Sequence, residues 1–353
     1  MTATLTNDGI AELLWHGAAE ETAHRRRALE RAARAARFWP EEAVTLAEAG
    51  TSLTELRAVG PWVAAHIHAW IDERPEMPEP DVTRRGYLTY AQVRRVLDAD
   101  PAWESTPHGD LQVHSTDSDG KVPLPEMAAA ARSAGRTFIA STDHSSSLRI
   151  ARGMSPAELA DQGQRIDAIN AGFTDTGEPF RVLRSIEMDV FDDGTCDMDA
   201  SDLAPLDLVL GAFHTKLRVT DDSTDRYLAA LRNRHVHVLA HPTARMFNRR
   251  VGLTADWPRV FAEAARLGKA VELDATPSRQ DLNVVLARLA VAAGVRWYTM
   301  GSDAHSIGEL EFLPFAMATA ALAGVPRERV LNYRTADEVV AWSRELEGSE
   351  SRQ

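Results

Sequence analysis

The sequence predicts a parallel α/β fold preceded by a small helical domain, and three observations lead to this. Short apolar runs alternate with helix-favouring segments from Gly109 to Val330, as expected for parallel strands joined by helices. Six of these runs end in, or just before, a histidine or a carboxylate. By contrast, residues 8–73 have a helical pattern throughout.

Length and composition limit the possible functions. A chain of 353 residues is long enough for one large α/β domain and one small domain. The net charge of −13 excludes a general attraction to nucleic acid, so any DNA contact needs a local basic patch. The single cysteine, Cys196, excludes an intramolecular disulfide and a cysteine-rich zinc site. Because no signal peptide or long apolar stretch is evident, we expect a cytoplasmic protein without a membrane span.

The N-terminal domain is expected to cover residues 1–80 and to be entirely helical. Residues 24–38 are rich in alanine and arginine, which favours a helix, and residues 41–49 predict a shorter one. A turn ending at Gly60 then precedes a helix that begins at Pro61, since glycine ends helices and proline begins them. This order is a helix–hairpin–helix pattern.

The remaining segments follow in order. Three prolines in residues 74–82 indicate a linker, which we extend over residues 81–107 with one connecting helix at 87–99. The α/β domain is expected over residues 108–345 and a disordered tail over 346–353. Its strands are expected to end near His114, His144, Glu187, His214, His241, Asp274 and Asp303, and its helices to cover residues 125–135, 156–171, 225–232, 257–267 and 281–293.

The strand ends carry a set of metal-type ligands. Parallel α/β folds place their chemistry at the carboxyl ends of the strands, so six such ends predict a multinuclear metal site. Histidines and carboxylates without thiolates suit Zn, Mn or Fe. Glu187 is the natural bridging ligand, because a carboxylate can bind two ions and an imidazole cannot. The acidic stretch 192–202 lacks the ligand spacing of a calcium loop and is interpreted as a hairpin and helix cap.

Two pairs of predicted site residues point to the same side of their strands. Two other histidines lie at the start of a strand instead of its end. Asp303 and His305 are separated by one residue, as are Gln112 and His114, so both members of each pair point into one cavity. Residues 235 and 237 are histidines that begin their strand and are expected to be structural.

Taken in order, these motifs resemble the polymerase and histidinol phosphatase (PHP) domain. The resemblance runs from about Asp110 to Trp342 and is closest to the PHP domain of bacterial family X DNA polymerases. It is carried by the phrases Asp110-Leu-Gln-Val-His-Ser115, Ser118-Asp-Gly120, Thr142-Asp-His144, Ala240-His-Pro-Thr-Ala-Arg245 and Ser302-Asp-Ala-His305.

The resemblance implies a distorted (βα)7 barrel that holds up to three divalent metal ions. It assigns His114, Glu187 and Asp303 to one ion, Glu187, His214 and His241 to a second, and Asp119, His144 and His305 to a third. The family usually begins with His-x-His, and Gln112 takes the first position here. A glutamine offers a ligand only through its neutral carbonyl oxygen, so we expect weaker binding of the first ion.

The activity implied is metal-assisted phosphoester hydrolysis, in which a water activated by the ions attacks phosphorus in line. Glu187, Asp303, His241 and Arg245 are the expected catalytic residues. Arg245 is the preferred phosphate clamp. The alternative clamps, which also follow strands, are Arg149, Lys216 and Arg279.

The helical region resembles the N-terminal helix–hairpin–helix domain of family X polymerases. Its turn, Ala58-Val-Gly60, has lost one glycine, and Pro61 lacks an amide donor. Residues 1–80 contain eight Lys and Arg against thirteen Asp and Glu, and the first lysine is Lys121, which excludes a Schiff-base lyase in this domain. The segment before Asp110 is too short for a polymerase palm, so we expect no DNA polymerisation.

Three residues are candidates for DNA contact, and three functions remain open. Arg27, Arg31 and Arg34 share a helix face, which either binds a phosphate backbone or is a solvated surface. The preferred function is 3′→5′ exonuclease or 3′-phosphatase action on DNA 3′ ends. The alternatives are a small-molecule phosphatase of the histidinol-phosphatase type, and a non-catalytic DNA- or protein-binding module with a decayed metal site. Oligomeric state cannot be predicted.

Overall fold

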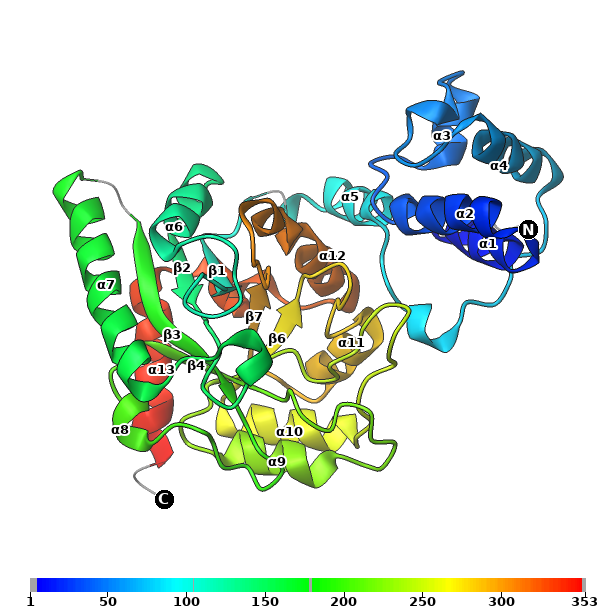
Figure 1. Cartoon of the computed structure of the whole chain (residues 1–353). Helices are drawn as coiled ribbons and strands as arrows, with labels where there is room; N and C mark the ends of the chain where they lie inside the picture. The colour runs from blue at the N-terminus through cyan, green and yellow to red at the C-terminus, as the bar shows by residue number, and fades with distance from the viewer. Residues whose placement is uncertain (1–4, 104, 178–179, 351–353) are drawn as a thin grey trace. The chain divides into compact units, whose positions relative to one another are not determined.

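The computed structural model describes residues 5–103, 105–177 and 180–350. The chain divides into two compact units, the helical unit Met1–Ala99 and the barrel unit Asp100–Gln353 (Figure 1). Within the described ranges, no helix is both long and apolar enough to cross a membrane.

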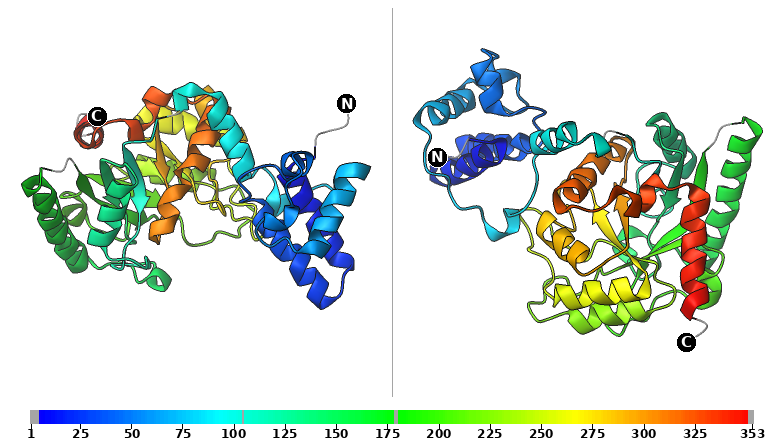
Figure 2. Two further views of the ribbon diagram at one scale, coloured as in Figure 1. Left: turned by 90° about the horizontal axis from the view of Figure 1, so that it is seen from above. Right: turned by 180° about the vertical axis from the view of Figure 1, so that it is seen from behind.

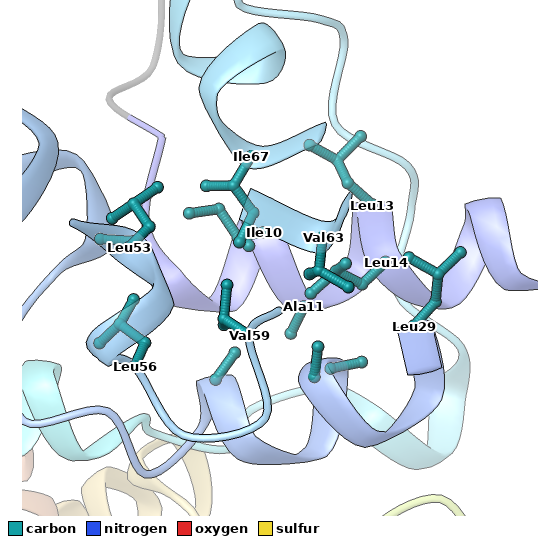
Figure 3. Close-up of a cluster of buried hydrophobic side chains, with 14 of the residues drawn as sticks. Ile10, Ala11, Leu13, Leu14, Leu29, Leu53, Leu56, Val59, Val63 and Ile67 are labelled. Carbon is teal, nitrogen blue, oxygen red and sulfur yellow. The ribbon is translucent and has the colours of Figure 1, made fainter. Parts of the chain in front are cut away.

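The helical unit has an apolar core that its helices up to residue 73 surround. Its helices are α1 (Asn7–Glu20), α2 (Ala23–Ala36), α3 (Ala43–Glu48), α4 (Pro61–Glu73) and α5 (Tyr90–Ala99). Ile10, Leu14, Leu29, Val63 and Ile67 are buried in this core, and Figure 3 shows them facing one another. The unit reaches Ala99, so α5, predicted as part of the linker, belongs to the helical unit.

One polar contact caps the start of α1, and another ties its middle to a later segment. The side chain of Thr6 caps the helix by accepting a hydrogen bond from the Gly9 amide at 3.3 Å. On the same helix, the Glu12 carboxylate forms a two-bonded ion pair with Arg84, with Nε–Oε1 2.8 Å and Nη2–Oε2 2.9 Å. Since such paired contacts are geometrically specific, they anchor the proline-rich segment that precedes α5.

The predicted hairpin turn connects a single 3₁₀ turn (Leu53–Glu55) to α4. Pro61 occupies the first turn of α4, as predicted, and Gly60 is its N-cap. Ala58 has a φ of 65°, a left-handed conformation that glycine adopts more readily. Ala58 therefore replaces the usual glycine of the hairpin at a position whose backbone conformation favours glycine.

The barrel unit contains seven parallel strands in sequential order, which confirms the predicted fold. They are β1 (Gly109–Val113), β2 (Phe138–Ser141), β3 (Arg181–Asp189), β4 (Leu208–Ala212), β5 (Val238–Leu239), β6 (Ala270–Asp274) and β7 (Trp297–Gly301). Every neighbouring pair from β1 to β7 is parallel.

Helices connect the strands and surround the sheet (Figures 1 and 2). They are α6 (Leu124–Ser133), α7 (Pro156–Asp175), α8 (Ala200–Leu203), α9 (Thr224–Arg232), α10 (Trp257–Leu267), α11 (Val284–Ala292), α12 (Leu313–Ala323) and α13 (Ala336–Glu350). Asp199 caps α8, and Val190 bridges Cys196 in the preceding loop. The acidic stretch is thus a hairpin and helix cap, as predicted.

The first and last strands, β1 and β7, meet at a seam that is joined by backbone hydrogen bonds and by one side chain, Asn332. The amide of His114 donates to the Ala304 carbonyl at 2.9 Å, and that of Asp303 donates to the Gln112 carbonyl at 3.0 Å. Below these bonds, the Asn332 side chain accepts from the Met300 amide at 2.7 Å. Its amide group donates to the carbonyls of Gly109 at 2.9 Å and Met300 at 2.7 Å. Asn332 thereby replaces a missing peptide group between β1 and β7.

The last helix extends the packed structure beyond the predicted boundary at residue 345. α13 continues to Glu350, and Leu346 is buried in the same core cluster as Leu111 of β1 and Leu208 of β4. The segment expected to be a disordered tail is therefore helical through Glu350, because its apolar face covers strand residues. Residues 351–353 lie outside the described residues.

Candidate metal centre

The carboxyl ends of the strands bring eight predicted ligands to one site. Glu187 lies within β3, and the others lie in the loops that follow β1, β2, β4, β5 and β7. The His114 ring stacks on that of His305 with centroids 4.3 Å apart. The His144 ring lies 4.6 Å from the first of these. The ligands brought together are His114, Asp119, His144, Glu187, His214, His241, Asp303 and His305.

Glu187 lies at the centre of the site, and each of its oxygens faces two imidazoles. Its Oε1 is 2.6 Å from His241 Nε2 and 3.0 Å from His214 Nε2. Its Oε2 is 3.3 Å from His114 Nε2 and 3.4 Å from His144 Nδ1. This arrangement suits a carboxylate that shares its two oxygens between neighbouring cations.

Two further carboxylates complete the opposite side. Asp303 Oδ1 is 3.0 Å from His114 Nε2. Asp119 Oδ1 is 3.2 Å from His305 Nε2 and 3.6 Å from His144 Nε2. Each histidine ring nitrogen in these pairs is therefore within reach of an anionic oxygen.

The donor set fits divalent cations. Three groups of ligand atoms each lie within 4.8 Å of one another: His114, Asp119, His144 and His305; His144, Glu187 and His214; and His114, Glu187 and Asp303. Several of these buried atoms have no hydrogen-bond partner in the described part of the chain: both His114 ring nitrogens, His144 Nδ1, His214 Nε2 and Asp119 Oδ1. Leaving a buried polar atom unpaired costs about 1–3 kcal/mol, so a cation at this position resolves an otherwise unfavourable arrangement.

These groups differ in detail from the predicted ligand sets. His114, Glu187 and Asp303 form one group as predicted. The predicted third set also appears, with His114 added to it. In the remaining group His144 takes the place of His241, although His241 contacts Glu187 directly. The assignment of each ligand to an ion stays a prediction.

Two ligands sit in left-handed backbone conformations where their strands end. His241 has a φ of 55° and Asp303 a φ of 52°, conformations that cost a non-glycine residue about 1–2 kcal/mol. The turn at His241 directs its ring toward Glu187, and the turn at Asp303 directs its carboxylate toward His114. Such unfavourable dihedrals are typical of functional sites.

Burial and neighbouring charges have opposing effects on the pKa values of the site residues. Burial, helped by the charges of His114 and His214, lowers the pKa of His144 to about 4. For His214, burial opposes the charged form, but Glu187 and Asp189 outweigh it and raise the pKa to about 9. Burial likewise disfavours ionised Glu187, yet the surrounding histidines hold its pKa well below the usual range. A ring of imidazoles thus keeps the central carboxylate anionic.

Asp189 supports the site and was not found from the sequence. Its Oδ1 lies 2.8 Å from His214 Nδ1, and Ser147 donates to its other oxygen. A carboxylate on the far nitrogen fixes the tautomer and orientation of a ligating imidazole. The sequence did contain an indication, because Asp189 lies two residues after Glu187 on the same strand. The same spacing led us to pair Asp303 with His305.

Asp143 organises the loop that carries Asp119. Its Oδ1 accepts bonds from the Ser115 amide at 2.8 Å and the Ser118 hydroxyl at 2.6 Å. Its Oδ2 accepts from the Ser115 hydroxyl at 2.8 Å and Gln162 Nε2 at 2.7 Å. Because these donors come from the loop and from α7, a buried carboxylate holds the loop in place.

The four candidate phosphate clamps occupy different environments. Arg245 is only 4% exposed, and its charge acts on the carboxyl of Asp281. Arg279 lies 3.5 Å from Asp303 Oδ2 and 3.8 Å from Asp274 Oδ2, so it neutralises carboxylates behind the site. Lys216 pairs with Asp192, and Arg149 is exposed.

Gln112 is buried beside Glu187, but its amide nitrogen faces the carboxylate. Its Nε2 donates to Glu187 Oε2 at 3.1 Å. Its Oε1, the atom expected to bind a metal, has no hydrogen-bond partner among the described residues. The side chain predicted to bind a metal therefore contacts the Glu187 carboxylate through its amide nitrogen.

Comparison with known proteins finds related sequences. The chain is 37% identical over 235 residues to the DNA polymerase/3'-5' exonuclease PolX of Bacillus subtilis (strain 168), a match that covers 66% of this chain and 40% of that protein. It is 31% identical over 160 residues to a probable phosphatase of Shewanella sediminis (strain HAW-EB3), covering 43% of this chain and 63% of the relative. The chain thus spans less than two thirds of either relative. No family model matches the chain.

A solved structure gives a weaker match. The histidinol phosphate phosphatase of Lactococcus lactis subsp. lactis, complexed with zinc, L-histidinol and phosphate, covers 69% of this chain with a TM-score of 0.40 and 14% identity. At that level the match carries no argument about the site. The sequence match to PolX confirms the resemblance that the motifs predicted.

Proposed function

We propose that this chain, a homologue of the PHP domain of family X DNA polymerases, is a metal-dependent phosphoesterase. The observation that carries the proposal is Glu187, whose two oxygens each face two imidazoles at 2.6–3.4 Å. Zn, Mn or Fe suits such nitrogen and oxygen ligands. We propose DNA 3′ ends as the preferred substrate.

The chain's own residues hold and orient the reacting groups in this proposal. Bound divalent ions would supply an acidified water and offset the charge on the phosphoryl oxygens. Asp189 holds His214 in one tautomer, and Arg279 keeps Asp303 anionic by its positive charge. Burial opposes ionised Asp303, but this guanidinium and His114 lower its pKa below the usual range. Asp303 therefore remains an anionic ligand near neutral pH.

The loops around the barrel mouth favour an extended substrate. Parallel strands place the loops that follow them at one end of a barrel. Two of these loops present an exposed apolar residue beside an exposed arginine, Arg149–Ile150 after β2 and Arg249 with Val251 after β5. Ile150 is 92% exposed and Val251 61% exposed. Positive charges along the phosphate backbone are typical of single-stranded nucleic-acid binding, so the two arginines support such a substrate.

A small phosphomonoester is the second candidate substrate. The helical unit supports it, since residues 1–80 are acidic and Ala58 replaces a hairpin glycine. A protein that had lost its dependence on DNA would tolerate both changes. The name of the Shewanella relative, probable phosphatase, agrees with this class.

The deciding experiment measures Mn- and Zn-dependent hydrolysis of two substrates side by side. One is single-stranded DNA with a labelled 3′ end, and the other is histidinol phosphate. The His214→Ala protein serves as the blank because His214 contacts both Glu187 and Asp189. Stepwise 3′ shortening that is lost in the blank supports the DNA proposal.

Other outcomes select the alternatives. Turnover of the small ester alone identifies a metabolite phosphatase. Purified protein that retains no metal and hydrolyses neither substrate points to a non-catalytic DNA- or protein-binding module. Binding to DNA that weakens as salt rises, by contrast, supports a nucleic-acid substrate.

A further inference from the structure

Gln112 lies in the innermost layer of the site. Its side chain is fully buried on β1, two residues before His114. The amide Nε2 donates to Glu187 Oε2 at 3.1 Å, the oxygen that also faces His114 and His144. This amide therefore contacts the carboxylate that two of the three ligand groups share.

The other end of the Gln112 amide faces away from the histidines. A Cβ placed on Gly301 of β7 would lie 2.9 Å from Gln112 Oε1 and 2.6 Å from Glu272 Oε1. Both oxygens therefore converge on this glycine, and Glu272 on β6 is fully buried. Gly301 has an ordinary backbone conformation, so its lack of a side chain serves to leave room for these two groups.

We propose that Gln112 is a positioning residue that holds the bridging carboxylate through its N–H group, and not a metal ligand. This inference rests on the proposed metal site. An amide N–H cannot bind a cation, but it can occupy one lone pair of a carboxylate oxygen and leave the other for a metal. With Oε2 fixed in this way, Glu187 presents its remaining lone pairs to the imidazoles in one orientation.

The alternative, binding through Gln112 Oε1, requires the amide to turn over. The carbonyl would then face the cations and the N–H group would face Gly301 and Glu272. The two interpretations predict opposite responses to a carboxylate at this position. As a ligand, Gln112→Glu would bind a cation more tightly, because it replaces a neutral oxygen with an anionic one. As a replacement for the donor, it would place two carboxylates in contact and weaken binding.

The test measures metal content and affinity of the full-length chain, using Zn²⁺ and Co²⁺ with a graded competing chelator. We expect Gln112→Glu and the near-isosteric Gln112→Met both to weaken the binding of at least one ion by about tenfold or more, the usual effect of removing a supporting hydrogen bond. Gln164→Glu and Gln164→Met are matched controls, since Gln164 is exposed on α7. They should bind metal as the wild type does.

The Co²⁺ absorption spectrum provides a reading that does not depend on affinity. At saturating Co²⁺, Gln112→Met should keep the wild-type band shape and intensity, because the coordination number is unchanged when no ligand is lost. A changed spectrum, tighter binding by Gln112→Glu, or unaltered affinity in Gln112→Met overturns the inference. If Gln112→Glu does not fold, the affinity and spectrum of Gln112→Met decide.

Failure of the proposed function has a different signature. Failure of the wild-type protein to bind metal would contradict the proposed metal site itself. Wild-type protein that binds metal, together with a Gln112→Glu protein that binds it more tightly, removes only the role given to Gln112.

Discussion

The ligands around Glu187 depend on neighbours that orient them. His214 is held on one side by Glu187 and on the other by Asp189, whose Oδ1 lies 2.8 Å from Nδ1. Its orientation is thus fixed by two carboxylates from one strand, β3. A change at either carboxylate alters the position of the imidazole as well as the charge of the site.

We expect Asp189→Asn to weaken metal binding by about 10–100-fold, because the amide no longer fixes the His214 tautomer. Zinc titration against a chelator measures the effect. Asp193→Asn is a matched control, since this exposed carboxylate in the loop after β3 accepts hydrogen bonds from Thr195. Equal affinities in Asp189→Asn and the wild type would show that the imidazole needs no such support.

Metal binding should release protons near neutral pH. The pKa of His214 is raised to about 9 in the metal-free protein, because Glu187 and Asp189 outweigh burial. The charged form therefore stabilises the metal-free fold fully below the ordinary pKa of about 6.5, and this stabilisation is lost as pH rises through about 9. A metal must displace this proton, so its affinity should increase with pH up to about 9.

Calorimetry in buffers with different ionisation enthalpies measures that release. We expect protons to be released at pH 7.5 and fewer at pH 9.5. The exposed Arg234→Ala variant should behave as the wild type. An enthalpy of zinc binding that does not depend on the buffer at pH 7.5 would contradict the expected protonation of His214.

The sequence predicted which residues gather around Glu187, but not the residues that support them. His114, Glu187 and Asp303 could be found because each ends or follows an apolar run, and the ends of parallel strands meet. Asp189 and Asp143 also lie at strand ends, but nothing in a linear pattern shows which atom a carboxylate faces. The orientation of the Gln112 amide depends on groups from β3, β6 and β7, which only the folded barrel brings together.

Among the larger elements, the hairpin of the helical unit departs from its usual composition. Ala58 has a φ of 65°, a conformation that costs a non-glycine residue about 1–2 kcal/mol. Glycine avoids this cost but loses about 0.4–1 kcal/mol through a more flexible unfolded chain. We therefore expect Ala58→Gly to raise the free energy of unfolding of the helical unit by about 0.5–1 kcal/mol.

Urea denaturation followed by tryptophan fluorescence checks this expectation. Ala65→Gly is the control, because Ala65 lies within α4 and should lose about 1 kcal/mol. Destabilisation by Ala58→Gly would show that the turn is not strained.

The seam between β1 and β7 depends on Asn332. Replacing this residue with alanine removes three hydrogen bonds to backbone groups of Gly109 and Met300 and leaves those groups buried. At about 1 kcal/mol or more for each, we expect Asn332→Ala to lower the free energy of unfolding by roughly 3 kcal/mol. Metal binding should weaken too, since β1 and β7 carry His114 and Asp303.

Chemical denaturation of the metal-free protein measures this cost. Asn332→Asp distinguishes the accepted hydrogen bond from the two donated ones. It keeps the acceptor for the Met300 amide but removes both donors. A loss under 1 kcal/mol in the alanine variant would mean that water replaces the side chain at the seam.

Several element boundaries could not be predicted from the sequence. The strands and most barrel helices lie close to their predicted ranges, because apolar periodicity determines them. The assignment of α5 to the helical unit depends on tertiary contacts, and so does the burial of α13 through Leu346. A polar, glutamate-rich C-terminal segment resembles a solvated tail until its apolar face has strands to cover.

For the whole molecule, the open question is whether the helical unit guides substrate. Arg27 and Arg31 are exposed on α2, while Arg34 pairs with Glu30 at 3.5 Å. If the unit contacts DNA, the double change Arg27→Glu and Arg31→Glu should reduce DNA turnover several-fold at low salt. It should also reduce the salt dependence of binding by about two phosphate contacts.

The rates are measured on labelled single-stranded DNA at several salt concentrations, with a small phosphomonoester as the reference substrate. The ester rate should not change, since the altered residues lie outside the barrel unit. The double change Arg234→Glu and Arg296→Glu, at exposed arginines of the barrel unit that precede β5 and β7, controls for net charge. Unaltered DNA turnover would remove α2 from the path of the substrate.

The distribution of the ligands along the chain has a consequence for biosynthesis. The first histidine of the centre is residue 114 and the last is residue 305, and the strands that carry them are neighbours at the seam. A ribosome must therefore translate almost the whole barrel before the first-made ligand meets its last-made partner. The complete site therefore cannot form before the segment that carries Asp303 and His305 has been translated and has left the ribosome.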